Sequence, residues 1–410
     1  MTNQEEEGGM RILHVLFALD RAGPANVCSQ LVRGLVRRGC AVEILSLREP
    51  DPGVAEALGV EVHHLDMRGP MDRGVARALE GHLRRSQPQI VHCHQVRADV
   101  YAAAAARRVG IPAIVSTIHA ALLDDYGYTY GQPGGWGAYL WHRRSLRRQH
   151  DALVFVSDYA RQQVQKHTLA PLCHPHTTVI HNGLEPELFA EALRLGPPPE
   201  IQRILDSGRP LLGCVGNLIR RKNVAAVIQA VGQLAQEGLF CDLVIVGSGP
   251  EERRLKRMTD DLGLQAQVHF LGYQRNVPAI LAGLDIYIHP SLSEGCPLAV
   301  VEAMLMGRAI VASAAGGIPE IIEDGQTGLL SPPGQLGPLV QNLRRALVHE
   351  EYRRKLGAAA QSYALTHLTA QAMTESYLAA YRGLLGETSG NEDRPEAAPR
   401  IAPEETEPCR

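Results

Sequence analysis

The stretch SEGCPLAVVEAM, residues 293–304, carries two acids with seven residues between them, Glu294 and Glu302. Glu302 stands between Val301 and Ala303, where a buried carboxylate without hydrogen-bond partners would cost free energy. Hydroxyl groups of a bound sugar or ribose could supply those partners, because a carboxylate accepts several hydrogen bonds. In the alternative interpretation, Glu302 complements a helix dipole and Glu294 is a solvated loop acid.

Pro297 indicates where the helix that carries Glu302 begins. Proline is favoured in the first helical turn, so the sequence predicts a helix from Pro297 or Leu298 to Met306. Glu294 would then lie in the loop before this helix.

The segment GNLIRRKN, residues 216–223, combines a glycine, three consecutive cations and the start of the next predicted helix. Free backbone N–H groups and cationic side chains together favour an anion. The alternative is a solvated basic turn. Only four lysines occur in the chain, so a compact ammonium retained at Lys222 favours a phosphate contact.

Two other patterns argue against rival chemistries. Gly247 and Gly249 follow a strand as in a dinucleotide-binding loop, but Glu252 replaces the third glycine, which disfavours an NAD enzyme. The chain has no D-x-D motif, and its histidines lack H-x-x-x-H spacing. His92 and His94 share one face of a predicted strand, where histidines are usually only hydrogen-bonded. The sequence therefore predicts no catalytic metal and no cofactor.

Length and composition set the frame for these residues. A chain of 410 residues predicts two domains, and a net charge of -3 disfavours a nucleic-acid partner. Eight scattered cysteines without a C-x-x-C pair suit a reducing compartment. The polar, acidic start does not resemble a signal peptide, and no apolar run is long enough for a membrane helix. A cytoplasmic protein is expected.

Apolar runs that alternate with helical stretches predict two α/β domains with parallel sheets. The predicted strands lie at 12–19, 41–47, 89–94, 112–119, 152–157, 177–182, 210–216, 241–247, 267–272, 284–290 and 308–313. The predicted organisation is a domain at 11–190, a proline-marked linker at 191–209, a domain at 210–368, a C-terminal helix at 369–386 that returns to the first domain, and a disordered acidic tail at 387–410. Parallel sheets bind ligands at the carboxyl ends of their strands, which is where both unusual segments fall.

The chain resembles the retaining glycosyltransferases of family 4 over nearly all of residues 11–385. The E-x7-E pair, Glu294 and Glu302, is the most specific match. The supporting motifs are GNLxxxKN (216–223), VGSGPE (246–251), AAGGIPEIIEDGQTGLL (314–330), VIHNG (179–183), IVHCH (90–94) and VSTIH (115–119). Family members have the GT-B fold, so the resemblance implies two Rossmann-like parallel-sheet domains that face each other across a cleft.

The resemblance also implies roles for single residues. Glu294 would bind hydroxyls of the donor sugar, Glu302 the nucleotide ribose and Lys222 the donor diphosphate. His119 would face the sugar near the reaction centre, and Gly23 would let the diphosphate and the acceptor approach the backbone. His119, Glu294 and Lys222 form the expected catalytic set. The expected donor-binding residues are Gly23, Asn217, Arg221, Lys222, Glu294, Gly295, Cys296, Pro297, Leu298 and Glu302.

Two departures from the family pattern bear on these roles. Family members commonly have arginine after the glycine where this chain has Asn217, and either Arg220 or Arg221 could replace that charge. The loop after the first strand reads Gly-Pro-Ala-Asn from Gly23, whereas the family often has Gly-Gly-x-Glu. This loop varies with the acceptor, so the acceptor cannot be carried over from the resemblance.

The resemblance implies a metal-independent hexosyltransferase that uses a UDP- or GDP-sugar and retains the anomeric configuration. A glycan or a lipid-linked acceptor in cell-surface polysaccharide or glycolipid synthesis is expected. Two other functions stay open: a nucleotide-sugar-binding subunit without turnover, given Asn217, and a dinucleotide-dependent oxidoreductase.

A last hypothesis concerns a membrane surface. Five glycines predict a flexible loop at 127–137, and the residues after it predict a short helix. Both tryptophans, Trp136 and Trp141, lie here, with Leu140 and Leu146 as an apolar side. The neighbouring cations are Arg143, Arg144, Arg147 and Arg148. Residues 136–148 could hold the protein on the inner face of the plasma membrane, where aromatic and basic side chains gather. Alternatively, the tryptophans pack into the core and the arginines are solvated.

Overall fold

The computed structural model describes residues 9–21, 23–69, 72–119, 122–165 and 171–386, with the backbone alone at 73 and 122–135. The described chain forms two compact units, one from Met1–His181 and Ala370–Arg410, the other from Asn182–Thr369. The division after His181 comes before the predicted boundary at 190. The expected tail at 387–410 lies outside the described residues.

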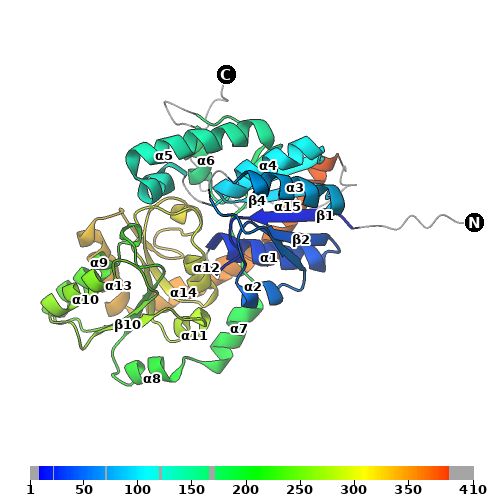
Figure 1. Cartoon of the computed structure of the whole chain (residues 1–410). Helices are drawn as coiled ribbons and strands as arrows, with labels where there is room; N and C mark the ends of the chain where they lie inside the picture. The colour runs from blue at the N-terminus through cyan, green and yellow to red at the C-terminus, as the bar shows by residue number, and fades with distance from the viewer. Residues whose placement is uncertain (1–8, 22, 70–71, 120–121, 166–170, 387–410) are drawn as a thin grey trace, which may run out of the picture. The chain divides into compact units, whose positions relative to one another are not determined.

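The first unit has a seven-stranded parallel sheet of order β3-β2-β1-β4-β5-β6-β7. Figure 1 labels three of these strands, β1, β2 and β4. Its strands are β1 (Arg11–Leu16), β2 (Ala41–Ser46), β3 (Glu61–His64), β4 (Ile90–His94), β5 (Ala113–Ile118), β6 (Ala152–Phe155) and β7 (Thr177–Val179). Its helices are α1 (Gly23–Arg37), α2 (Pro52–Glu56), α3 (Arg73–Ser86), α4 (Val96–Val109), α5 (Leu122–Gln149), α6 (Asp158–Gln165) and α15 (Ala370–Leu385). Side chains of α3 and α4 share one core with alternate residues of β1, β2 and β4. The last helix, α15, packs on α1.

The second unit has a six-stranded parallel sheet of order β10-β9-β8-β11-β12-β13. Its strands are β8 (Leu211–Val215), β9 (Asp242–Val246), β10 (Val268–Gly272), β11 (Ile286–His289), β12 (Ala309–Ser313) and β13 (Leu329–Ser331). Its helices are α7 (Pro186–Leu195), α8 (Pro199–Leu205), the 3-10 turn η1 (Arg220–Lys222), α9 (Val224–Gln236), α10 (Glu252–Asp261), α11 (Val277–Leu281), α12 (Leu298–Leu305), the 3-10 turn η2 (Ile318–Glu320), α13 (Leu336–Val348) and α14 (Glu350–His367). Apolar residues of α9, α13 and the strands form its main core.

These two sheets confirm the predicted α/β class with two Rossmann-like parallel-sheet domains. In each sheet the strand order reverses direction once, between β1 and β4 in the first unit and between β8 and β11 in the second. Doubly wound sheets bind ligands at such reversal points, beyond the carboxyl ends of the strands. The segment 216–223 follows β8, and the loop with Glu294 follows β11.

Three expectations need correction. The proposed linker at 191–209 contains the end of α7 and all of α8, with Pro199 as the first residue of α8. Strands β3 and β13 were missed, because EVHH has no apolar run and β13 has only three residues. The predicted flexible loop at 127–137 is wrong, since α5 is one helix of 28 residues.

The reason for the error in α5 is visible at its C-terminal part. His142 Nε2 lies 2.8 Å from Asp99 Oδ2, and the Ser145 hydroxyl donates to the Asp99 carbonyl at 2.7 Å, so this part is held on α4. Each glycine in a helix costs only about 1 kcal/mol, which tertiary packing can outweigh. Leu146, expected in an exposed apolar side, is instead fully buried.

Candidate active site

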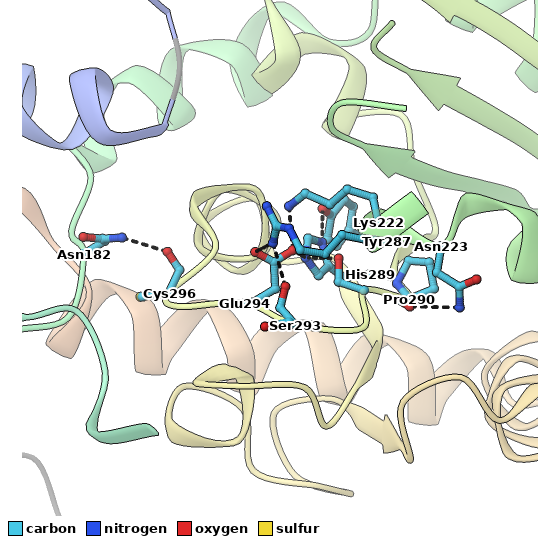
Figure 2. Close-up of polar contacts among 11 residues, drawn as sticks. Asn182, Lys222, Asn223, Tyr287, His289, Pro290, Ser293, Glu294 and Cys296 are labelled. Carbon is cyan, nitrogen blue, oxygen red and sulfur yellow. Dashed lines mark hydrogen bonds and ion pairs between the residues drawn. The ribbon is translucent and has the colours of Figure 1, made fainter. Parts of the chain in front are cut away.

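Glu294 lies at the centre of a cluster of polar side chains in the second unit (Figure 2). One carboxylate oxygen, Oε1, is 2.5 Å from Lys222 Nζ and 3.0 Å from His289 Nε2. The other, Oε2, is 3.2 Å from Arg221 Nη1, which also donates to the Ser293 carbonyl at 2.6 Å. The cluster therefore joins the segment after β8 to the segment after β11.

The charges around Glu294 fix its protonation state. Burial alone would raise the pKa of Glu294, but the Lys222 ammonium, the His289 hydrogen bond and the Arg221 guanidinium lower this pKa well below its usual value. The carboxylate is thus ionised at neutral pH. Lys222 uses one of its three N–H donors on Glu294, so the others can bind a second anion.

His289 is a member of the cluster that the sequence did not single out. Burial lowers the pKa of His289 more than the Glu294 carboxylate raises it, so the imidazole is neutral at pH 7. With Nε2–H donated to Glu294, Nδ1 accepts from the Tyr287 hydroxyl at 3.0 Å. The sequence could have indicated His289 by its position, because it is the last residue of β11 and lies five residues before Glu294.

Backbone contacts hold the cluster in place. The Leu292 N–H donates to the Arg221 carbonyl at 2.8 Å, and the Asn223 side chain donates to the Pro290 carbonyl at 3.3 Å. Gly316 has φ +62° and lies so close to Glu294 that an added Cβ would be 1.8 Å from the Glu294 carbonyl oxygen. Only glycine fits there, because both the left-handed backbone and the contact exclude a side chain.

The loop after Glu294 is fixed at Cys296. The Asn182 side-chain amide donates to the Cys296 carbonyl at 2.7 Å, as Figure 2 shows. Gly295 lies between Glu294 and this anchored residue, and Pro297 is the N-cap of α12, which begins at Leu298 and ends at Leu305. The predicted helix from Pro297 or Leu298 to Met306 is thereby confirmed to within one residue.

Glu302 lies inside α12, where it differs sharply from Glu294. Among the residues that the structure describes, no hydrogen bond or ion pair reaches its side chain. Burial raises the pKa of Glu302 to about 7. A carboxyl group in this position favours a ligand that can donate hydrogen bonds.

The two arginines of the segment 216–223 lie in different environments. Arg220 is almost fully exposed, with its Nε 3.7 Å from Glu251 Oε1, whereas Arg221 is mostly buried beside Glu294. Asn217 is exposed and its carbonyl accepts from the Ile219 N–H at 2.9 Å. Arg221 is therefore the arginine that the structure brings to the cluster.

Gly23 and His119 belong to the first unit. Gly23 is the first residue of α1, and a Cβ there would contact nothing within 4 Å. Nothing in the described chain thus requires glycine at this position, and close approach of a ligand stays a prediction.

His119 follows β5 and ends a chain of hydrogen-bonded imidazoles. Its Nε2 is 3.1 Å from His94 Nδ1, and His94 Nε2 is 3.0 Å from His14 Nδ1. Burial lowers the pKa of His119 to about 4, so its imidazole is neutral at pH 7. His92, on the same strand as His94, bonds the Thr117 hydroxyl at 2.7 Å. These strand histidines are hydrogen-bonded, as the sequence predicted.

The chain matches two family models of glycosyltransferases. The model of Glycosyltransferase Family 4 matches residues 21–188, and that of Glycosyl transferases group 1 matches residues 200–363. The two models together cover most of the chain, so it belongs to the glycosyltransferases of family 4, which share the GT-B fold.

Individual relatives are distant in sequence. The chain is 26% identical to the alpha-D-kanosaminyltransferase of Streptomyces kanamyceticus, over 67% of this chain and 72% of the relative. It is 26% identical to the UDP-Gal:alpha-D-GlcNAc-diphosphoundecaprenol alpha-1,3-galactosyltransferase of Escherichia coli, over 64% and 67%. For several other curated relatives, the match spans about half of the relative's length.

A solved structure shares the fold over most of this chain. The crystal structure of Anabaena HepE in complex with UDP-glucose superposes with a TM-score of 0.74 at 20% identity. The match covers 91% of this chain and 100% of that one. At this identity the likeness establishes the GT-B fold.

Proposed function

We propose that this glycosyltransferase transfers a hexosyl unit from a UDP- or GDP-sugar with retention of anomeric configuration. The observation that carries the proposal is the cluster of Lys222, Arg221 and Glu294 at the strand-order reversal of the second sheet. Two cations and one ionised carboxylate within a few ångströms suit a donor that has both a diphosphate and sugar hydroxyls. We assign Lys222 and Arg221 to the diphosphate, Glu294 to the sugar and Glu302 to the ribose.

In the proposed reaction, the acceptor hydroxyl attacks the anomeric carbon on the face from which the nucleoside diphosphate departs. The carbon–oxygen bond to the diphosphate breaks, the bond to the acceptor oxygen forms, and the acceptor proton passes to the leaving phosphate. No enzymic nucleophile takes part. The protein positions the donor and stabilises the charge that develops on the diphosphate, chiefly through Lys222.

The acceptor we propose is a glycan or a lipid-linked sugar. The Escherichia coli relative, by its name, adds galactose to a sugar on diphosphoundecaprenol. The same class of acceptor would place this chain in the synthesis of a cell-surface polysaccharide or glycolipid.

A lipid-linked acceptor also requires contact with a membrane surface. No helix in the described part of the chain is long and apolar enough to span a bilayer. We propose that the exposed face of α5, formed by Leu140, Trp141, Arg144, Arg147 and Arg148, rests on the inner face of the plasma membrane. Arg143 does not belong to this face, because it donates to the Pro171 carbonyl at 2.9 and 2.6 Å.

Incubation with radiolabelled UDP- and GDP-sugars in EDTA tests the proposed activity. We expect release of the nucleotide with transfer or slow hydrolysis of the sugar. Lys222→Ala should lower the rate by about 10²–10³-fold, as for loss of one charge-stabilising group. Arg220→Ala is the matched control, since this neighbouring cation is exposed, and it should retain the wild-type rate.

Other outcomes would refute the proposal in different ways. Donor binding without any turnover would indicate a nucleotide-sugar-binding subunit. Equal rates for Lys222→Ala and Arg220→Ala would show that the cluster is structural. Activity that disappears in EDTA would contradict the metal-independent mechanism.

A further inference from the structure

Three side chains of the first unit converge away from the residues assigned to catalysis. Glu43 comes from β2, His63 from the edge strand β3, and His82 from α3. One carboxylate oxygen and one ring nitrogen from each histidine lie within 4.8 Å of one another. In the sheet, Glu43 pairs with Glu61 and Leu45 pairs with His63, so Glu43 and His63 point to the same face.

Two atoms of this group are buried and make no hydrogen bond. His82 Nε2 and Glu43 Oε2 are 3.3 Å apart but do not meet in hydrogen-bonding geometry. In the described part of the chain each of these atoms has only this ion-pair contact with the other, and a metal ion between them would give both atoms a ligand bond. Ligands held at about 2.0–2.2 Å around a tetrahedral zinc ion are separated by about 3.3–3.6 Å, which matches this distance.

The charges of the group also favour a cation. Glu43 and Glu61 lie side by side in register on adjacent strands, and Glu61 Oε1 is 3.7 Å from His63 Nε2. About a third of the Glu43 and His63 side chains is exposed, which gives an ion access from solvent.

We propose that Glu43, His63 and His82 bind a divalent transition-metal ion of the Zn²⁺ type, with water as the fourth ligand. Two imidazoles and a carboxylate suit such an ion, whereas Mg²⁺ and Ca²⁺ prefer sites made of oxygen atoms. The ion ties the edge strand β3 to β2 and α3. This strand has four residues and none of them is buried, so a metal bond would hold it where apolar packing is absent.

Two other groups of potential ligands provide competing assignments, and each includes a cysteine: His14, Cys28 and His94, and Cys93, Asp99 and His150. His14, Cys28 and His94 also lie within 4.8 Å of one another, but all are buried and the two histidines are hydrogen-bonded to each other. A metal in either group would have a thiolate ligand. The thiolate gives a spectroscopic signature that the Glu43 site lacks.

The test uses the full chain without a polyhistidine tag, stripped with EDTA and then freed of it. We expect calorimetry to show saturable binding of one Zn²⁺ and thermal unfolding to shift upward by several degrees with Zn²⁺ but not with Mg²⁺. His63→Ala and Glu43→Gln should each weaken Zn²⁺ binding by at least about tenfold, the loss that even changes outside the ligand shell can cause. His64→Ala is the control, because His64 is adjacent on β3 and bonds Asp66 at 3.0 Å instead.

Cobalt substitution decides the assignment on the unmutated protein. Bound Co²⁺ should show visible ligand-field bands of a tetrahedral site without a thiolate charge-transfer band, and Cys28→Ser should leave this spectrum unchanged. Absence of saturable Zn²⁺ binding, any thiolate charge-transfer band in the Co²⁺ spectrum, or wild-type affinity in both His63→Ala and Glu43→Gln would each overturn the proposal. None of these measurements depends on transferase activity, so their failure would leave the proposed function untouched.

Discussion

The two acids of the E-x7-E pair occupy opposite electrostatic environments. Glu294 is surrounded by Lys222, Arg221 and His289, and its pKa is well below the usual value. Glu302 has no such partners among the described residues, and burial raises its pKa to about 7. Two carboxylates whose environments drive their pKa values apart are typical of a functional site. Glu294 is always ionised near neutral pH, whereas Glu302 titrates there.

This contrast makes the stability of the ligand-free protein depend on the pH through Glu302. Its folded-state pKa is above the usual glutamate value of 4.5, so ionisation of Glu302 destabilises the folded protein. This loss of stability is absent below about pH 4.5, grows as the pH rises, and is complete above about pH 7. Glu302→Gln should therefore stabilise the ligand-free protein above pH 7, by at most about 3 kcal/mol, and have little effect at pH 5. Calorimetric unfolding of both proteins at pH 5, 6, 7 and 8 measures the difference.

Under the proposed assignment of Glu302 to the ribose, the same variant should bind the nucleotide sugar more weakly, because an amide oxygen would replace an ionised hydrogen-bond acceptor. If Glu302 binds the ligand, Glu302→Gln should make the ligand-free protein more stable and lower its affinity for the donor. If Glu302 only complements the dipole of α12, Glu302→Gln would lower stability above pH 7 and leave donor affinity unchanged.

Among the elements, α5 has one face on the core and one in solvent. His142, Ser145 and Leu146 are buried, whereas Leu140 and Trp141 are 48% and 42% exposed. Arg144, Arg147 and Arg148 are exposed and lie three, four or seven residues after Leu140 or Trp141. Residues at these spacings lie on one side of a helix, so the five side chains form one exposed stripe. Trp136 instead packs against the core of the first unit.

We expect this stripe to bind anionic vesicles. Each arginine near an anionic bilayer contributes about 1 kcal/mol, so replacing Arg144, Arg147 and Arg148 with serine should reduce binding by about 10²-fold. Co-sedimentation with phosphatidylserine vesicles at low salt measures this, and added salt should release the wild-type protein. Serine at Arg354 and Lys355, two exposed cations of α14, provides the control. Equal sedimentation with neutral and anionic vesicles would contradict the proposal.

Elements with a strong local pattern could be predicted from the sequence, and elements that depend on their neighbours could not. The start of α12 was predicted because proline fixes the backbone there. Strand β3 could not be predicted, since EVHH becomes a strand only by pairing with β2. Helix α5 is continuous despite its glycines, and contacts with Asp99 of α4 hold its C-terminal part.

The same distinction applies to the candidate site. Lys222, Arg221 and Glu294 were selected by their motifs, and the structure brings these three together. His289 was missed because it ends an ordinary strand, and its role is visible only when the loop returns Glu294 to within 3.0 Å. No sequence pattern linked Glu43, His63 and His82, which meet only through strand register.

For the whole molecule, the first unit is built from both ends of the described chain. Tyr377 and Tyr381 of α15 are buried in it, and their hydroxyls lie 2.9 Å from the Thr117 hydroxyl and 2.6 Å from His92 Nδ1. The second unit is formed by one continuous segment, Asn182–Thr369. The stability of the first unit should therefore depend on the last helix.

Truncation after Thr369 should destabilise the first unit, because it removes the buried tyrosines of α15. Burial of a large apolar side chain contributes about 1.5–3 kcal/mol, so the two tyrosines together represent a large part of the stability of a domain. Truncation after Gly386 keeps α15 and is the matched control. Thermal unfolding should show a lower transition for the first truncation only, and identical transitions would refute the dependence.

Because the first unit consists of two segments separated by the second unit, it cannot finish folding until the end of the chain has been synthesised. The strands of the first unit emerge early, but His92 must wait for a partner 289 residues further along the chain. At about 5–20 residues per second, synthesis of the intervening segment Asn182–Thr369 takes about 10–40 s. Throughout that time, the sheet face that α15 will cover stays open to chaperones and to other nascent chains. The second unit, Asn182–Thr369, can therefore finish folding before the unit that begins the chain.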